Sequence, residues 1–168
     1  MDLSGATAQF TILAFAGQLI AAAASDWRSL MIPNRYCLAL VALFPSYVIA
    51  QGGDVAWMGH VLYGAGAFAA GFLLFSLRVC GGGDVKLFAA VALWAGPALF
   101  LPMLIYTALC GGVMAVVLWV HHRLRRSSVP ANLNYAADSA AFAKQPMPYA
   151  VAIAAGGLFV ALQLLMGI

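Results

Sequence analysis

The chain has 168 residues, of which 65% are hydrophobic and only 8% are charged. A soluble domain usually carries about 25% charged residues, so this chain lacks the polar surface of a soluble protein, and the bilayer is its expected solvent. The length suits one membrane-embedded domain over residues 1–168 and leaves little for a separate soluble domain.

The first three apolar segments have the composition of membrane-crossing helices. Such a helix needs about 20 apolar residues, with a range of roughly 17–25. The first, at about 8–24, follows an N-terminus without bases, so we interpret it as a retained span and not as a signal peptide. The second, at about 36–50, is short and contains Pro45. The third, at about 57–77, is rich in small residues that let helices pack closely in lipid.

The next segment is too long for one crossing. Residues Val85 to Val120 form an uncharged run of 36 residues. As a single helix it would be roughly 54 Å long, against a hydrocarbon core of about 30 Å. We therefore expect it to fold back, with Gly96-Pro97 and Pro102 marking the turn. The predicted fold is all-α, with six transmembrane helices at about 8–24, 36–50, 57–77, 85–97, 100–120 and 148–167.

The basic residues predict the orientation of these helices. If both termini lie outside, the inside loops are 25–35, 78–86 and 121–147, and they hold all eight Lys and Arg residues. This pattern explains the net charge of +3 without a nucleic-acid partner. The cluster 121–126 fits a juxtamembrane basic anchor. The stretch 131–145 is Ala-rich and compatible with a short interfacial helix.

The three cysteines do not indicate a metal site. Cys37, Cys80 and Cys110 include no Cys-x-x-Cys pair, which argues against a disulfide framework and against zinc. We interpret them as packing residues, and we expect neither a metal nor another cofactor.

Two aspartates lie at the ends of apolar segments on the predicted cytoplasmic side. Asp26 follows the first segment, and Asp84 opens the fourth, after three glycines. An ionisable side chain beside a membrane span is costly, so its default interpretation is functional. Two neighbouring carboxylates share one proton because both cannot easily ionise at short range. One would then activate water as a base while the other protonates the departing nitrogen of a peptide bond. Asp26 and Asp84 are therefore the candidate catalytic residues.

Residues around the aspartates supply candidate supporting roles. Gly81 and Gly83 give backbone freedom and leave room for an extended peptide near Asp84. Lys86 would either orient charge or face lipid headgroups. Pro33-Asn34 provides a rigid turn at the start of the second span, which would fix the loop that carries Asp26.

These motifs resemble a known family. The resemblance is carried by three motifs in order: Asp26 followed by Ile32-Pro33-Asn34, then Gly81-x-Gly83-Asp84-x-Lys86, and finally the segment 148–154 (PYAVAIA). With these motifs the sequence resembles the type IV prepilin peptidases, which are membrane aspartic proteases of the GxGD class. The resemblance implies six transmembrane helices in a bacterial inner membrane. It also implies cleavage of prepilin or pseudopilin leaders at the cytoplasmic membrane boundary, with Asp26 and Asp84 as the catalytic pair.

The resemblance is to the short form of the family. Larger members carry an additional cytoplasmic domain with paired Cys-x-x-Cys motifs, and they also N-methylate the new terminus. This sequence matches no such domain and is similar to the peptidase-only form that serves tight-adherence (Flp-type) pili, so methylation is not expected. The sequence leaves open which prepilin is cut and which oligomer forms.

Two other functions fit parts of the pattern. In a non-enzymatic proton or ion pathway, or a pilus-assembly component, the same acids would relay charge. Such a pathway needs more polar groups within the bilayer, where Gln18, Thr107 and Gln163 are the main candidates. A metal-dependent transferase acting on a lipid phosphate would need clustered acids around Mg²⁺, and the chain has no Glu.

Overall fold

The computed structural model describes residues 3–53, 55–126 and 148–167. All the secondary structure within these ranges is helical, which confirms the all-α prediction. The stretch 131–145, considered above as an interfacial helix, lies outside the described residues. The helices are α1 (Leu3–Ser29), α2 (Asn34–Ala50), α3 (Trp57–Ser76), α4 (Gly82–Arg126) and α6 (Tyr149–Met166).

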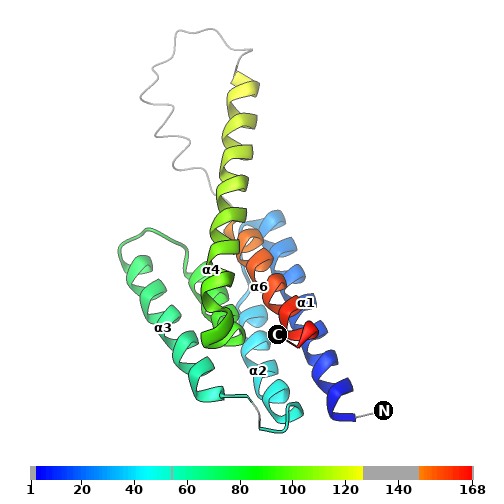
Figure 1. The fold of residues 1–168 in the computed structure, drawn as a ribbon. Coiled ribbons are helices and arrows are strands. Elements are labelled where there is room, and N and C mark those ends of the chain that lie inside the picture. Colours follow the sequence, from blue (N-terminus) through cyan, green and yellow to red (C-terminus); the bar gives the residue numbers. More distant parts are fainter. Residues whose placement is uncertain (1–2, 54, 127–147, 168) are drawn as a thin grey trace.

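Helix α4 consists of two arms that meet at Gly96. This residue has φ 58° and ψ −167°, a conformation that is essentially restricted to glycine. The first arm, 82–95, and the second arm, 97–126, run in opposite directions, and the second arm extends past the other helices (Figure 1). The fold-back predicted at Gly96-Pro97 is therefore present. Pro102, by contrast, lies inside the helical second arm.

Within the described ranges, four helices are long and apolar enough to cross a membrane. They are Gly5–Ser29, Trp57–Ser76, Gly82–His121 and Tyr149–Met166, and α2 is a shorter apolar helix of 17 residues. The candidate Gly82–His121 contains the reversal at Gly96. Each of the six predicted segments thus coincides with a helical segment, while the number of crossings and the sides of the termini stay predictions.

The core lies between α1, α2, α6 and the first arm of α4. At its centre the Trp94 indole is fully buried and stacks on Phe15, with ring centroids 4.3 Å apart. Trp94 Nε1 also donates a hydrogen bond of 2.9 Å to the carbonyl oxygen of Leu40. Helix α3 packs against α4 and exposes Phe72 and Leu73 on its other face, as expected of a lipid-facing helix.

The helices alternate in direction, so four functional segments meet at one end of the bundle. The end of α1 and the starts of α2, α4 and α6 lie at this end, which we call the aspartate end because it holds Asp26, Asn34, Asp84 and Ala150 (Figure 1). The start of α1, the α2–α3 connection and the Gly96 reversal lie at the opposite end.

Both aspartates lie within helices, just outside the predicted spans 8–24 and 85–97. Helix α1 continues past residue 24, and the Leu30 amide still donates to the Asp26 carbonyl oxygen at 2.8 Å. Helix α4 begins at Gly82, and Asp84 lies in its first turn. Backbone hydrogen bonding thus continues both helices through polar residues that lie beyond the apolar runs.

Candidate functional site at the aspartate end

Asp26 is held by a helix that is remote in sequence. Its side chain is only 5% exposed, and Oδ2 accepts a hydrogen bond of 3.0 Å from the backbone amide of Ala150. Helix α6 begins at Tyr149 after Pro148, so the Ala150 amide is one of the first N–H groups, which have no partner within the helix. The positive end of the helix dipole also favours a negative charge here. The start of α6 therefore binds the Asp26 carboxylate.

Asp84 is held by its own turn. It is the third residue of α4 and is half-buried, and its carboxylate accepts a hydrogen bond from the Gly81 amide. This is the contact made by the acid of a capping box, which reaches back to the residue before the helix. A β-carbon at Gly81 would lie 2.8 Å from Asp84 Oδ2. Any side chain at position 81 would therefore displace the carboxylate.

The fold brings the two acids within electrostatic range of each other, although they are 58 residues apart in sequence. The charge of the Asp26 carboxylate acts on the Asp84 carboxylate. Two partly or fully buried acids in this relation do not both ionise easily, which favours one ionised and one protonated carboxyl. Such a pair could supply one proton acceptor and one proton donor.

The α1–α2 connection packs directly on the turn that carries Asp84. A β-carbon at Gly83 would lie 3.3 Å from Ile32 Cβ, so this glycine allows close approach of the connection. Pro33, with φ −59° and ψ 133°, precedes the first residue of α2. That residue, Asn34, accepts a hydrogen bond of 3.0 Å from Lys86 Nζ. The Pro33-Asn34 turn is thus joined to α4 by Lys86, a contact that the sequence did not predict.

Two backbone positions beside the aspartates have unusual conformations. Leu30, just after α1, has φ 51°, and Arg78, just after α3, has φ 59°. Within the described part of the chain they are the residues other than glycine with positive φ. A side chain in this region costs energy, so the surrounding contacts must hold both connections in place. A hydroxyl group helps to hold the connection after α1, because Ser25 Oγ, near the end of α1, donates to the Met31 carbonyl oxygen at 3.2 Å.

Exposed bases surround the aspartate end. They are Arg28 on α1, Arg35 on α2, Arg78 in the α3–α4 connection and Lys86 on α4, and all four are exposed. Bases at this level suit the anionic headgroups of a membrane surface.

Two cysteines that sequence reasoning treated as packing residues lie near the acids. The buried Cys37 thiol on α2 interacts electrostatically with Lys86 and Asp84. Cys80 lies in the α3–α4 connection, where burial and the Asp84 charge raise the pKa of its thiol. Sequence reasoning also missed the Ala150 amide as a ligand of Asp26. The sequence signal for this part of the site is the segment 148–154, which carries part of the family resemblance.

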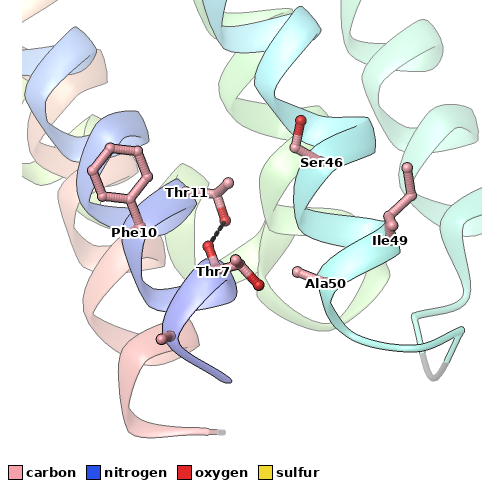
Figure 2. A pocket seen from close by; sticks show the side chains of 7 residues that line it. Thr7, Phe10, Thr11, Ser46, Ile49 and Ala50 are labelled. Atoms are coloured by element: carbon pink, nitrogen blue, oxygen red, sulfur yellow. Dashed lines mark hydrogen bonds between the residues drawn. The ribbon is translucent and has the colours of Figure 1, made fainter. Parts of the chain in front are cut away.

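The groove at the other end of the bundle lacks the chemistry of this site. It lies between the start of α1 and the end of α2, and Figure 2 shows Thr11 bonded to Thr7 beside Phe10 and Ile49. Thr11 precedes Asp26 by 15 residues, about 22 Å along the helix. The groove is lined by apolar and hydroxyl side chains, and none of its lining residues is titratable. Among the described residues, no cluster of three or more His, Cys, Asp or Glu side chains could hold a metal ion.

The fold and the aspartate end define a multi-pass helical membrane protein with a pair of neighbouring acids between its helices. The chain matches the model of the type IV leader peptidase family over residues 13–116, a range that includes Asp26 and Asp84. It therefore belongs to the type IV leader peptidase family, and the resemblance drawn from the motifs is confirmed.

A curated relative is consistent with this membership. The chain is 27% identical over 155 residues to the prepilin leader peptidase/N-methyltransferase of Bacillus subtilis (strain 168). The match covers 89% of this chain and 54% of the relative, so the chain spans about half the length of that protein. No solved structure matches the chain.

Proposed function

We propose that the protein is a membrane aspartic endopeptidase that cleaves the leader peptide of type IV prepilins or pseudopilins. The observation that carries this proposal is that Asp26 and Asp84 lie at the same end of the bundle, where their charges interact and each carboxylate accepts a hydrogen bond from a backbone amide. Membership of the leader peptidase family and the similarity to the Bacillus subtilis protein support the class of substrate.

The chemistry follows from two acids that share one proton. The ionised carboxylate takes a proton from water, and the resulting hydroxide equivalent attacks the carbonyl carbon of the scissile peptide bond. The protonated carboxyl donates its proton to the departing nitrogen, and the carbon–nitrogen bond breaks. Positioned acid and base groups of this kind contribute about 10²–10⁴-fold each to the rate.

The proposed setting is the cytoplasmic boundary of a bacterial inner membrane. The chain would cross six times with both termini outside, because this arrangement leaves Arg28, Arg35, Arg78 and Lys86 on the cytoplasmic side. The exposure of these four bases around the aspartate end supports that orientation. A substrate that is anchored in the membrane would then present its leader junction at the level of the two acids.

The proposed substrates are small pilins of the Flp type. This part of the proposal rests on the motif resemblance drawn from the sequence around Asp26, Asp84 and the segment 148–154. N-methyltransferase activity is named for the Bacillus subtilis relative, of which this chain spans about half, and the proposal assigns none to this chain.

The test is co-expression with small candidate prepilins, with cleavage measured by the mass of the pilin. Asp26→Asn and Asp84→Asn keep the shape of each side chain but remove its proton exchange, so each is expected to reduce cleavage by at least about 10²-fold. Ser46→Ala, in the groove at the opposite end, is the matched control and should cleave normally.

Insertion of every variant into the membrane is measured in the same cells, so that loss of cleavage is separated from loss of protein. Normal processing by either Asn variant would overturn the two-aspartate mechanism. Absence of cleavage by the unaltered protein, with every Flp-type pilin offered, would overturn the substrate assignment.

A further inference from the structure

We propose that Asp26 is the member of the pair that stays ionised and acts as the general base, and that the Ala150 amide holds it in that state. The role of Asp26 as a general base rests on the proposed function. The assignment of the charge to Asp26 is independent of it and concerns the resting protein.

The contact between α6 and Asp26 is sealed from water. Asp26 is 5% exposed and Ala150 is fully buried, so water has little access to replace the amide as donor. A hydrogen bond from an amide to a charged acceptor is stronger than one to a neutral acceptor. Burial of the Asp26 carboxyl by itself favours the protonated form, and the Ala150 amide opposes this by favouring the ionised form.

The two acids differ in where their amide donors come from. The donor to Asp84 is Gly81, three residues away in the same turn, and Asp84 is only half-buried. The donor to Asp26 lies 124 residues away, at the start of a separate helix. Since the pair shares one proton, fixing the charge on Asp26 leaves that proton on Asp84, which is the more accessible of the two to a leaving nitrogen.

Other charged groups at the aspartate end do not reverse this assignment. Lys86 on α4 bonds Asn34 and interacts with the Cys37 thiol of α2. Cys80, before α4, interacts with Asp84. Among the described residues, the other charged or titratable side chains near this end are Arg28 on α1, Arg35 on α2, Arg78 after α3 and Tyr149 on α6, which are exposed, and Tyr36 on α2, which is half-buried beside Arg35.

The decisive measurement is a carboxyl titration of the full chain in lipid nanodiscs. The chain has five aspartates and no Glu, so ¹³C labelling of Asp gives few carboxyl signals, and Asp→Asn variants assign them. We expect the Asp26 signal to titrate at lower pH than the Asp84 signal. The reverse order would overturn the proposal whether or not the protein cleaves any pilin.

A backbone substitution tests the role of the amide. Replacing Ala150 by L-lactic acid in cell-free synthesis exchanges its N–H for an ester oxygen and keeps the methyl group. The Asp26 midpoint should move up by about one pH unit, the size expected for loss of a hydrogen bond to a charged acceptor. The equivalent ester at Tyr149, one residue earlier in α6, is the control and should leave the midpoint unchanged.

Where a pilin substrate is cleaved, the same pair of esters gives a kinetic readout. The acid limb of the rate profile should move to higher pH in the Ala150 ester, with KM unchanged, because the base then protonates more readily. A change confined to KM, or an equal effect of both esters on the Asp26 midpoint, would show that the start of α6 has only a structural role.

Discussion

The two arms of α4 are both apolar, yet they occupy opposite environments. In the first arm, Leu87, Val91 and Trp94 are fully buried. In the second arm, Leu109 and Val113 are more than half exposed. One residue, Gly96, separates the two arms.

This difference shows that apolarity does not decide burial in a membrane protein. Lipid solvates an exposed Leu or Val as well as a protein core does, so close packing between helices carries the stability. The first arm packs among the other helices and also carries Asp84 at its start. The arm that positions the candidate catalytic acid is thus the packed one, and paired substitutions in the two arms should differ in their effect on stability.

The largest expected difference is between two tryptophans. Trp94→Ala should lower the free energy of unfolding by about 3 kcal/mol, since it leaves a cavity against Phe15 and removes the hydrogen bond to Leu40. Trp119→Ala, in the second arm, removes a side chain that is 47% exposed and should cost less than about 1 kcal/mol. Unfolding of both variants in mixed micelles measures the difference, and equal losses would contradict the comparison.

The next largest expected difference in the free energy of unfolding is between two glycines. An alanine at Gly96 would require an unfavourable φ, and its β-carbon would collide with the His60 ring. We expect Gly96→Ala to destabilise the protein by about 2–3 kcal/mol. At Gly112, in the second arm, an added β-carbon meets no atom within 4 Å, so Gly112→Ala should be neutral or stabilising by up to about 1 kcal/mol. The same unfolding assay measures both, and a neutral Gly96→Ala would mean that the reversal does not depend on glycine.

The smallest expected difference in stability is between two basic residues, one in each arm. Lys86→Met removes the hydrogen bond to Asn34, which is exposed, so stability should fall by at most about 1 kcal/mol. Because that bond fastens the turn of Asp84 to α2, cleavage of a pilin should still fall a few-fold. Arg123→Met, at the far end of the second arm, removes only a contact over the Trp119 ring and should leave cleavage unchanged. If both variants cleaved like the unaltered protein, Lys86 would have no part in positioning Asp84.

Much of the helical plan was predictable from sequence because it depends on local rules. The uncharged run Val85–Val120 is too long for one crossing, and Gly96-Pro97 is the natural place for it to turn. The distribution of bases predicted that Asp26 and Asp84 share one side, and the structure brings them to the same end of the bundle. Hydropathy predicts the apolar spans but not where α1 ends and α4 begins, because it does not reflect the hydrogen bonds that extend a helix through polar residues.

The sequence by itself determined that this protein is helical and apolar, where its long segment reverses, and that two acids stand at helix ends on one side. The tertiary structure alone decided which arm of α4 is buried, that Ile32 packs on Gly83, and that the Ala150 amide binds Asp26. The physical reason is that hydropathy and turn chemistry act over a few residues. A hydrogen bond between residues 124 positions apart exists only once separate helices have packed.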